Sequence, residues 1–152
     1  MIRQRYDRQR LNAVQPDEVS ARRCPATDAL VAACRADLAT RPLVVLGAPD
    51  AEVARRACLW LDGSWWLQEA SAAGRVAIRL KALWRDRAAT TALRDDDAWD
   101  TGWARDGAAL VGLVPRRATL VVLEGGLDPA VLSTLARDSS TWRRPVRLLL
   151  LA

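Results

Sequence analysis

The residues best placed to do chemistry in this sequence lie in the stretch RPLVVLGAPDAEVARR, residues 41–56. An apolar run typical of a strand ends at Gly47, and Asp50 begins a segment with the pattern of a helix. The turn between a strand and a helix N-terminus is where backbone N–H groups bind phosphate. Here the turn and first helical residues carry Asp50 and Glu52. At about 4 Å and an effective dielectric near 20, one like-charge contact costs about 4 kcal/mol, so we expect phosphate to be repelled.

Other common chemistries lack their central residues. The chain has no His, which removes the usual general base and any Ser–His or Cys–His pair. Its three cysteines, Cys24, Cys34 and Cys58, form no CxxC pair and predict buried or idle thiols, not a zinc site. Three consecutive acids, Asp95–Asp97, point in different directions and predict a solvated loop. We expect no catalytic residue, no metal and no cofactor.

Composition favours a soluble globular protein. The chain has 152 residues, of which 51% are hydrophobic and 27% charged, and this length is enough to bury a core. No apolar run reaches the roughly 20 residues that span a bilayer, and no secretory signal follows the charged N-terminus. We therefore expect a cytoplasmic protein with no membrane partner. The basic residues are almost all Arg, a bias typical of a GC-rich bacterial genome.

The elements that must position these residues alternate along the chain. Apolar runs and one alternating segment predict strands at 43–47, 75–84, 119–124 and 146–152. Capping residues Thr27, Asp50 and Asp128 predict helices over 27–38, 50–61 and 128–138. Between them, residues 85–113 are expected to be helical or irregular, with RDDDAWDTGW a loop.

Strands that alternate with helices predict an α/β fold with a mainly parallel central sheet of about four to five strands and helices on both faces. The segment 1–26 carries alternating Arg residues and two prolines, which predicts a basic N-terminal arm. We expect residues 27–152 to form a single α/β domain.

Over residues 41–152 this order resembles the P-loop NTPases, closest to RecA-like and STAND-type domains. The resemblance is carried by the strand, turn and helix around Gly47 and by the later strand TLVVLE, which ends at Glu124 where these proteins have a magnesium-binding acid. The segment 106–126, DGAALVGLVPRRATLVVLEGG, is also similar to RecA-like repair accessory proteins, which act by binding proteins. The resemblance implies a P-loop/RecA-like three-layer sandwich.

The residues that hold a nucleotide in those proteins are missing here. In the pattern G-x-x-x-x-G-K-[ST] begun at Gly47, the second glycine is Glu52, the lysine is Val53 and the hydroxyl residue is Ala54. Asp50 adds a second acid to this degenerate loop. The resemblance therefore implies a pseudo-ATPase, and an active NTPase is not expected.

Three features predict contact with other molecules. Trp99 and Trp103 lie four residues apart beside several Asp residues, so we expect them exposed on one face for a partner. Arg143 and Arg144 predict part of a basic rim together with Arg116, Arg117 and Arg147. The apolar strand that ends the sequence predicts an open sheet edge and a homodimer through it.

These expectations favour a non-catalytic P-loop-like domain that acts as a protein-interaction or regulatory module in a bacterial complex. The alternative is a RecA-like DNA-repair or nucleic-acid-associated accessory protein that uses its Arg-rich surface. The net charge of +5 is a weak argument for nucleic acid over a chain of this length.

Overall fold

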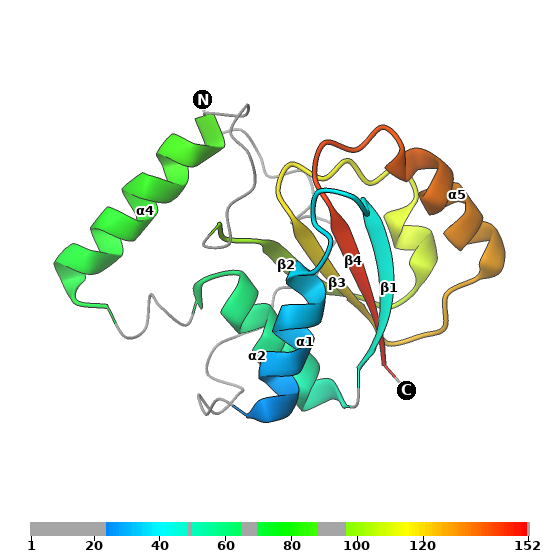
Figure 1. The fold of residues 1–152 in the computed structure, drawn as a ribbon, viewed down its shortest axis with the longest axis horizontal. Coiled ribbons are helices and arrows are strands. Elements are labelled where there is room, and N and C mark those ends of the chain that lie inside the picture. The colour runs from blue at the N-terminus through cyan, green and yellow to red at the C-terminus, as the bar shows by residue number, and fades with distance from the viewer. Residues whose placement is uncertain (1–23, 49, 65–69, 88–96, 152) are drawn as a thin grey trace.

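A computed structural model describes residues 24–48, 50–64, 70–87 and 97–151 (Figure 1). The α-helices are α1 Pro25–Arg35, α2 Ala51–Leu61, α4 Ala72–Arg87 and α5 Pro129–Ser139, with one 3-10 turn, η3 Gly107–Leu110. The strands are β1 Leu43–Ala48, β2 Asp100–Ala104, β3 Thr119–Leu123 and β4 Val146–Leu151. Nearly all of the expected arm, and also Asp95 and Asp96, lie outside the described residues. Within the described ranges, none of the helices has the length and apolar character needed to span a bilayer.

The strands form one four-stranded sheet in the order β1-β4-β3-β2, and every pairing is parallel. This confirms the predicted α/β fold with a mainly parallel sheet. The helices α1 and α2 pack on one face, while α5 and η3 pack on the other (Figure 1). The connection through α2 leads from β1 to β2 at the opposite edge, whereas α5 leads from β3 to its neighbour β4.

The two central strands are buried on both faces. Alternate side chains, Leu120 and Val122 of β3 and Leu149 of β4, face α1 and α2. Their neighbours Val121 and Leu148 face α5 and η3 on the other side. Burial on both faces explains why these strands are continuous apolar runs, as expected for parallel strands.

Two helices begin where local capping chemistry predicts. The Asp50 carboxylate accepts a hydrogen bond from the Val53 amide at 2.7 Å, and Asp128 accepts one from the Ala130 amide at 2.7 Å. The predicted start of the first helix is wrong, because its N-cap is Cys24 and not Thr27. Proline is favoured in the first turn, so α1 begins at Pro25.

The strand predicted at 75–84 is wrong, because these residues lie within α4. Ser71 directly precedes the helix, and its hydroxyl accepts a hydrogen bond from the Gly74 amide at 3.2 Å, as an N-cap side chain does. The segment AAGRVAIRLKALWRDR is rich in Ala, Leu and Arg, which are strong helix formers. These preferences outweigh the alternation of Val76, Ile78 and Leu80.

The loop predicted across RDDDAWDTGW is partly wrong, because residues 100–104 form strand β2. The Trp99 amide donates to the Leu61 carbonyl at 2.8 Å, and the Asp100 amide donates to the Ala118 carbonyl at 2.9 Å. The Thr101 hydroxyl adds a hydrogen bond to Asp62, just beyond α2, at 3.3 Å. This strand is therefore set by pairing with β3 and by the end of α2, and not by its own composition.

The open edge predicted for the last strand is also wrong. Hydrogen bonds join β4 to β1 on one side and to β3 on the other, so β4 is an interior strand. The edges of the sheet are β1 and β2. A homodimer through the β4 edge is incompatible with this pairing, because both rows of backbone groups are already used.

A buried arginine joins α1 to the sheet. Arg147 on β4 is 0% exposed, and its guanidinium donates to the carbonyls of Cys34, Ala36 and Arg41, each at 2.9 Å. Two of these carbonyls belong to the end of α1, where backbone acceptors lack helical partners and the helix dipole is negative. Burial lowers the pKa of Arg147 from its usual value. The guanidinium thus acts as a C-terminal cap for α1.

Replacing this guanidinium with an apolar side chain tests its role. We expect Arg147→Met to lower the free energy of unfolding by about 3 kcal/mol, because buried carbonyls lose their donor. Urea denaturation measures the change. Arg143→Ala is the control, since that side chain is exposed and the change should stay within about 0.5 kcal/mol. Equal stability of Arg147→Met and the wild type would contradict the capping role.

Candidate functional site

The carboxyl edge of the sheet is where ligands bind in folds of this class. The helix after β1 packs on one face of the sheet and the helix after β3 packs on the other, the arrangement that accompanies ligand binding beyond the strand ends in such folds. Pairing places Gly47 level with Leu150, and Leu150 level with Leu123. Two strand spacings, about 10 Å, therefore separate the ends of β1 and β3.

The amide that a phosphate would use at the start of α2 is already engaged. The Asp50 carboxylate accepts the hydrogen bond from the Val53 amide, so a negative group of the chain itself caps the positive end of the helix. Glu52 is the second residue of α2, and its carboxylate pairs with Arg56 one turn later. An incoming anion would have to displace Asp50 and approach Glu52.

The other residues singled out by the P-loop comparison lie in different environments. Val53 and Ala54 are 7% and 0% exposed and pack into the core under α2, so these positions serve packing. Glu124 is exposed at the end of β3, and its amide donates to the Ala104 carbonyl at 3.3 Å. Gly47 is exposed, and a Cβ added there would meet nothing within 4 Å. Gly47, Glu124 and the start of α2 thus lie at the carboxyl edge of the sheet.

The prediction that Trp99 and Trp103 are exposed is wrong. They are 3% and 9% exposed and belong to the core between α2 and the sheet. Arg55 lies over the Trp103 ring, 5.6 Å from its centroid, and the Trp103 indole N–H finds no acceptor among the described residues. Strand pairing of β2 turns these rings inward, which the polar neighbours in the sequence did not indicate. Neither ring is presented to a partner in this fold.

A different tryptophan is exposed. Trp84 on α4 is 79% exposed, and Val76 and Leu80 on the same helix are 57% and 53% exposed. The sequence analysis missed this set, because the alternation over residues 75–84 predicts a strand. The signal was present as apolar residues about one helical turn apart, at positions i, i+4 and i+8.

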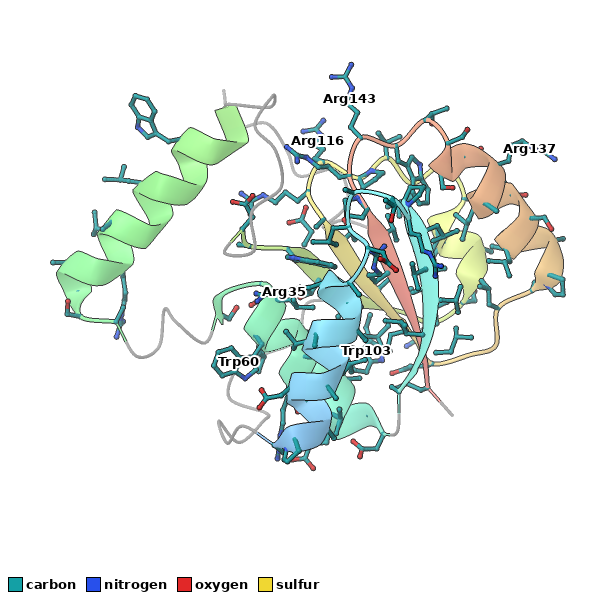
Figure 2. All side chains as sticks on the ribbon, viewed as in Figure 1. Arg35, Trp60, Trp103, Arg116, Arg137 and Arg143 are labelled. Carbon is teal, nitrogen blue, oxygen red and sulfur yellow. The ribbon has the colours of Figure 1, made fainter. Side chains whose placement is uncertain are left out.

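Basic side chains gather at the amino edge of the sheet. Parallel pairing places Thr119 level with Val146, so the segment with Arg116 lies beside the segment with Arg143. Figure 2 shows these two arginines at the same end of the sheet, and both are exposed. Arg117 and Arg144 are half-buried in the same two segments. Arg147, expected in this rim, is instead fully buried under α1.

The described residues include no group of three or more acidic or Cys side chains able to hold a metal ion. The cysteines lie in different environments. Burial raises the pKa of Cys34 to about 11, and burial also raises the pKa of Cys58. The Cys24 thiol is hydrogen-bonded to the Thr27 hydroxyl at 3.0 Å, and this bond lowers the pKa of Cys24.

Comparison of the chain with known protein families, curated proteins and solved structures finds no match.

The cysteine environments predict one reactive thiol. At pH 8 we expect Cys24 to react with Ellman's reagent first, because a lowered pKa gives more thiolate at a given pH. Cys34 and Cys58 should react at least about 1000-fold more slowly, since access requires opening a core stable by about 5 kcal/mol or more. Absorbance at 412 nm follows the reaction. Cys24→Ser should abolish the fast phase, and a fast phase that persists would contradict these environments.

Proposed function

We propose that this chain is a P-loop-like domain that does not use a nucleotide and acts as a protein-interaction or regulatory module. The order of strand β1, which contains Gly47, helix α2 and the later core strand β3, which Glu124 directly follows, supports the P-loop-like scaffold. The carboxylate of Asp50 at the α2 N-terminus supports the loss of nucleotide binding. A scaffold that keeps its core but closes its phosphate position is left with its surface as the working part.

The observation that carries the interaction role is a row of apolar side chains on α4. We call Val76, Leu80 and Trp84 the α4 row. All three are more than half exposed, although burial of such side chains is worth about 1.5–3 kcal/mol each. Soluble proteins rarely leave contiguous apolar surface open unless another molecule covers it. The α4 row therefore favours binding of a partner.

Calorimetry with ATP and Mg²⁺ tests the absence of nucleotide binding. We expect no heat of binding up to millimolar ATP, which places any dissociation constant above about 1 mM. The reason is that the Asp50 carboxylate already accepts the hydrogen bond of the Val53 amide, and Val53 stands where the P-loop pattern has its lysine. An intact P-loop protein run beside it provides the positive control. A micromolar dissociation constant for this chain would defeat the proposal.

Nucleic-acid binding is the second candidate, and the arginines at the amino edge favour it. Phosphate contacts by Arg are salt-dependent, since each contact releases counterions. If this surface binds nucleic acid, fluorescence anisotropy with a single-stranded oligonucleotide will show affinity that falls steeply between about 50 and 200 mM salt. Arg143→Ala should weaken binding severalfold. Arg137→Ala is the control, because Arg137 is exposed on α5 and lies to the side of Arg116 and Arg143 (Figure 2).

An affinity that does not change with salt concentration would exclude this surface as a phosphate contact. Equal losses of affinity in the Arg143 and Arg137 variants would exclude it as well. Absence of binding at the lower salt concentration would leave the protein-interaction function as the one supported candidate.

A further inference from the structure

The helix α4 lies away from the other helices and strands that the structure describes. Figure 1 shows it beside the sheet with its covering helices, and none of the described elements packs closely against it. Its start is nevertheless well defined, because Ser71 caps it and the Arg75 side chain donates to the Ala70 carbonyl at 3.0 Å. A preformed helix loses little conformational entropy when it binds.

The α4 row follows one line along this helix. Side chains four residues apart lie on the same side of a helix, so Val76, Leu80 and Trp84 form a continuous apolar line about two turns long. Half of the large hydrophobic side chains that are exposed in the described part of the chain belong to this row. The others are Val45 on β1 and, in the segment after η3, Val111 and Val114.

The charge of the helix limits what covers the row. Its sequence, AAGRVAIRLKALWRDR, contains five basic residues and one acid. Two such helices would repel each other, which disfavours a second copy of this chain. The N-terminal segment 1–26 is also rich in Arg, so the same repulsion disfavours it as a cover. An acidic surface is electrostatically complementary to α4.

The spacing of the row favours a protein groove over a lipid surface. Helices that lie in a membrane interface need a broad apolar face opposite a strongly polar one. Helices that dock in a protein groove use a few anchors at positions such as i, i+4 and i+7. The α4 row has this second form, with Trp84 as its largest anchor. Trp is among the residues that most often dominate binding energy.

We propose that α4 is a docking helix that inserts Val76, Leu80 and Trp84 into an apolar groove with acidic rims on a partner protein. This inference rests on the proposed interaction function and adds the partner's chemistry and the contact helix. The apolar anchors supply affinity, while the basic residues of α4 select an acidic rim and speed association.

Site-specific cross-linking in the natural cells tests the inference. One form of the tagged full chain carries a photo-cross-linking amino acid in place of Leu80. The matched control carries it in place of Val114, which is 61% exposed in the segment after η3. We expect one protein to cross-link at least about 10-fold more strongly from position 80. The cross-linked peptide of that protein should contain apolar residues flanked by Asp or Glu.

Binding of that purified partner is then measured by calorimetry. Trp84→Ala and Leu80→Asp should each weaken binding at least about 10-fold, and affinity should fall with added salt. Val114→Asp should leave binding unchanged. Leu80→Asp should also leave the urea midpoint of the free chain unchanged, because the side chain is already 53% exposed. If Leu80→Asp lowers the urea midpoint, the test is decided by Trp84→Ala, whose side chain is the most exposed of the row.

The outcomes separate the two proposals. If a partner binds but the α4 variants behave like Val114→Asp, docking through α4 is wrong and the interaction function stands. If no protein cross-links or co-purifies from any position, both fail. If the chain instead binds vesicles of anionic phosphatidylglycerol, or dimerises by light scattering, and Leu80→Asp abolishes that behaviour, the protein groove is replaced by a membrane or by a second copy.

Discussion

The guanidinium of Arg147 is the interaction on which the arrangement of α1, β1 and β4 depends. It is fully buried on an interior strand, where an ionised side chain is costly unless its donors are satisfied. Carbonyls from the end of α1 and from Arg41, just before β1, satisfy them. One side chain therefore closes a helix end and fixes the entry to the edge strand.

The same physics of helix ends also governs the carboxyl edge. At α1 the negative end of a helix holds a cation of the chain, and at α2 the positive end holds the Asp50 carboxylate. Both termini have thus been closed by side chains of the protein itself. In folds of this class the start of the helix after the first strand is the usual position for a phosphate. The internal cap stabilises the helix and engages the amide that a ligand would use there.

Two features of the surface are not part of the core. The α4 row and the arginines at the amino edge lie outside both hydrophobic clusters of the core. They differ in chemistry, since the α4 row offers apolar anchors and the amino edge offers guanidinium groups. Trp99 and Trp103, which look like anchors in the sequence, instead complete the core beneath α2.

Much of the scaffold follows from the sequence because its signals are local. The apolar runs of β1, β3 and β4 predict strands in a parallel sheet, and the carboxylates of Asp50 and Asp128 place the starts of α2 and α5 to within a residue. A cap acts on amides two or three residues away, so no distant contact is needed. The absence of a complete G-x-x-x-x-G-K-[ST] pattern around Gly47 is equally clear from the sequence, because the pattern depends only on residue types at fixed spacing.

What the sequence left open was decided by contacts between distant residues. Val76, Ile78 and Leu80 fit a strand, while Val76, Leu80 and Trp84 fit a helix, and both periods occur in the same segment. Residues 100–104 become a strand only because β3 supplies a partner. The sequence suggests that Arg147 is a surface cation. Its burial depends on the carbonyl of Cys34, which lies 113 residues earlier in the chain. Patterns report local preference, but burial of polar and aromatic groups depends on which partners the fold brings within reach.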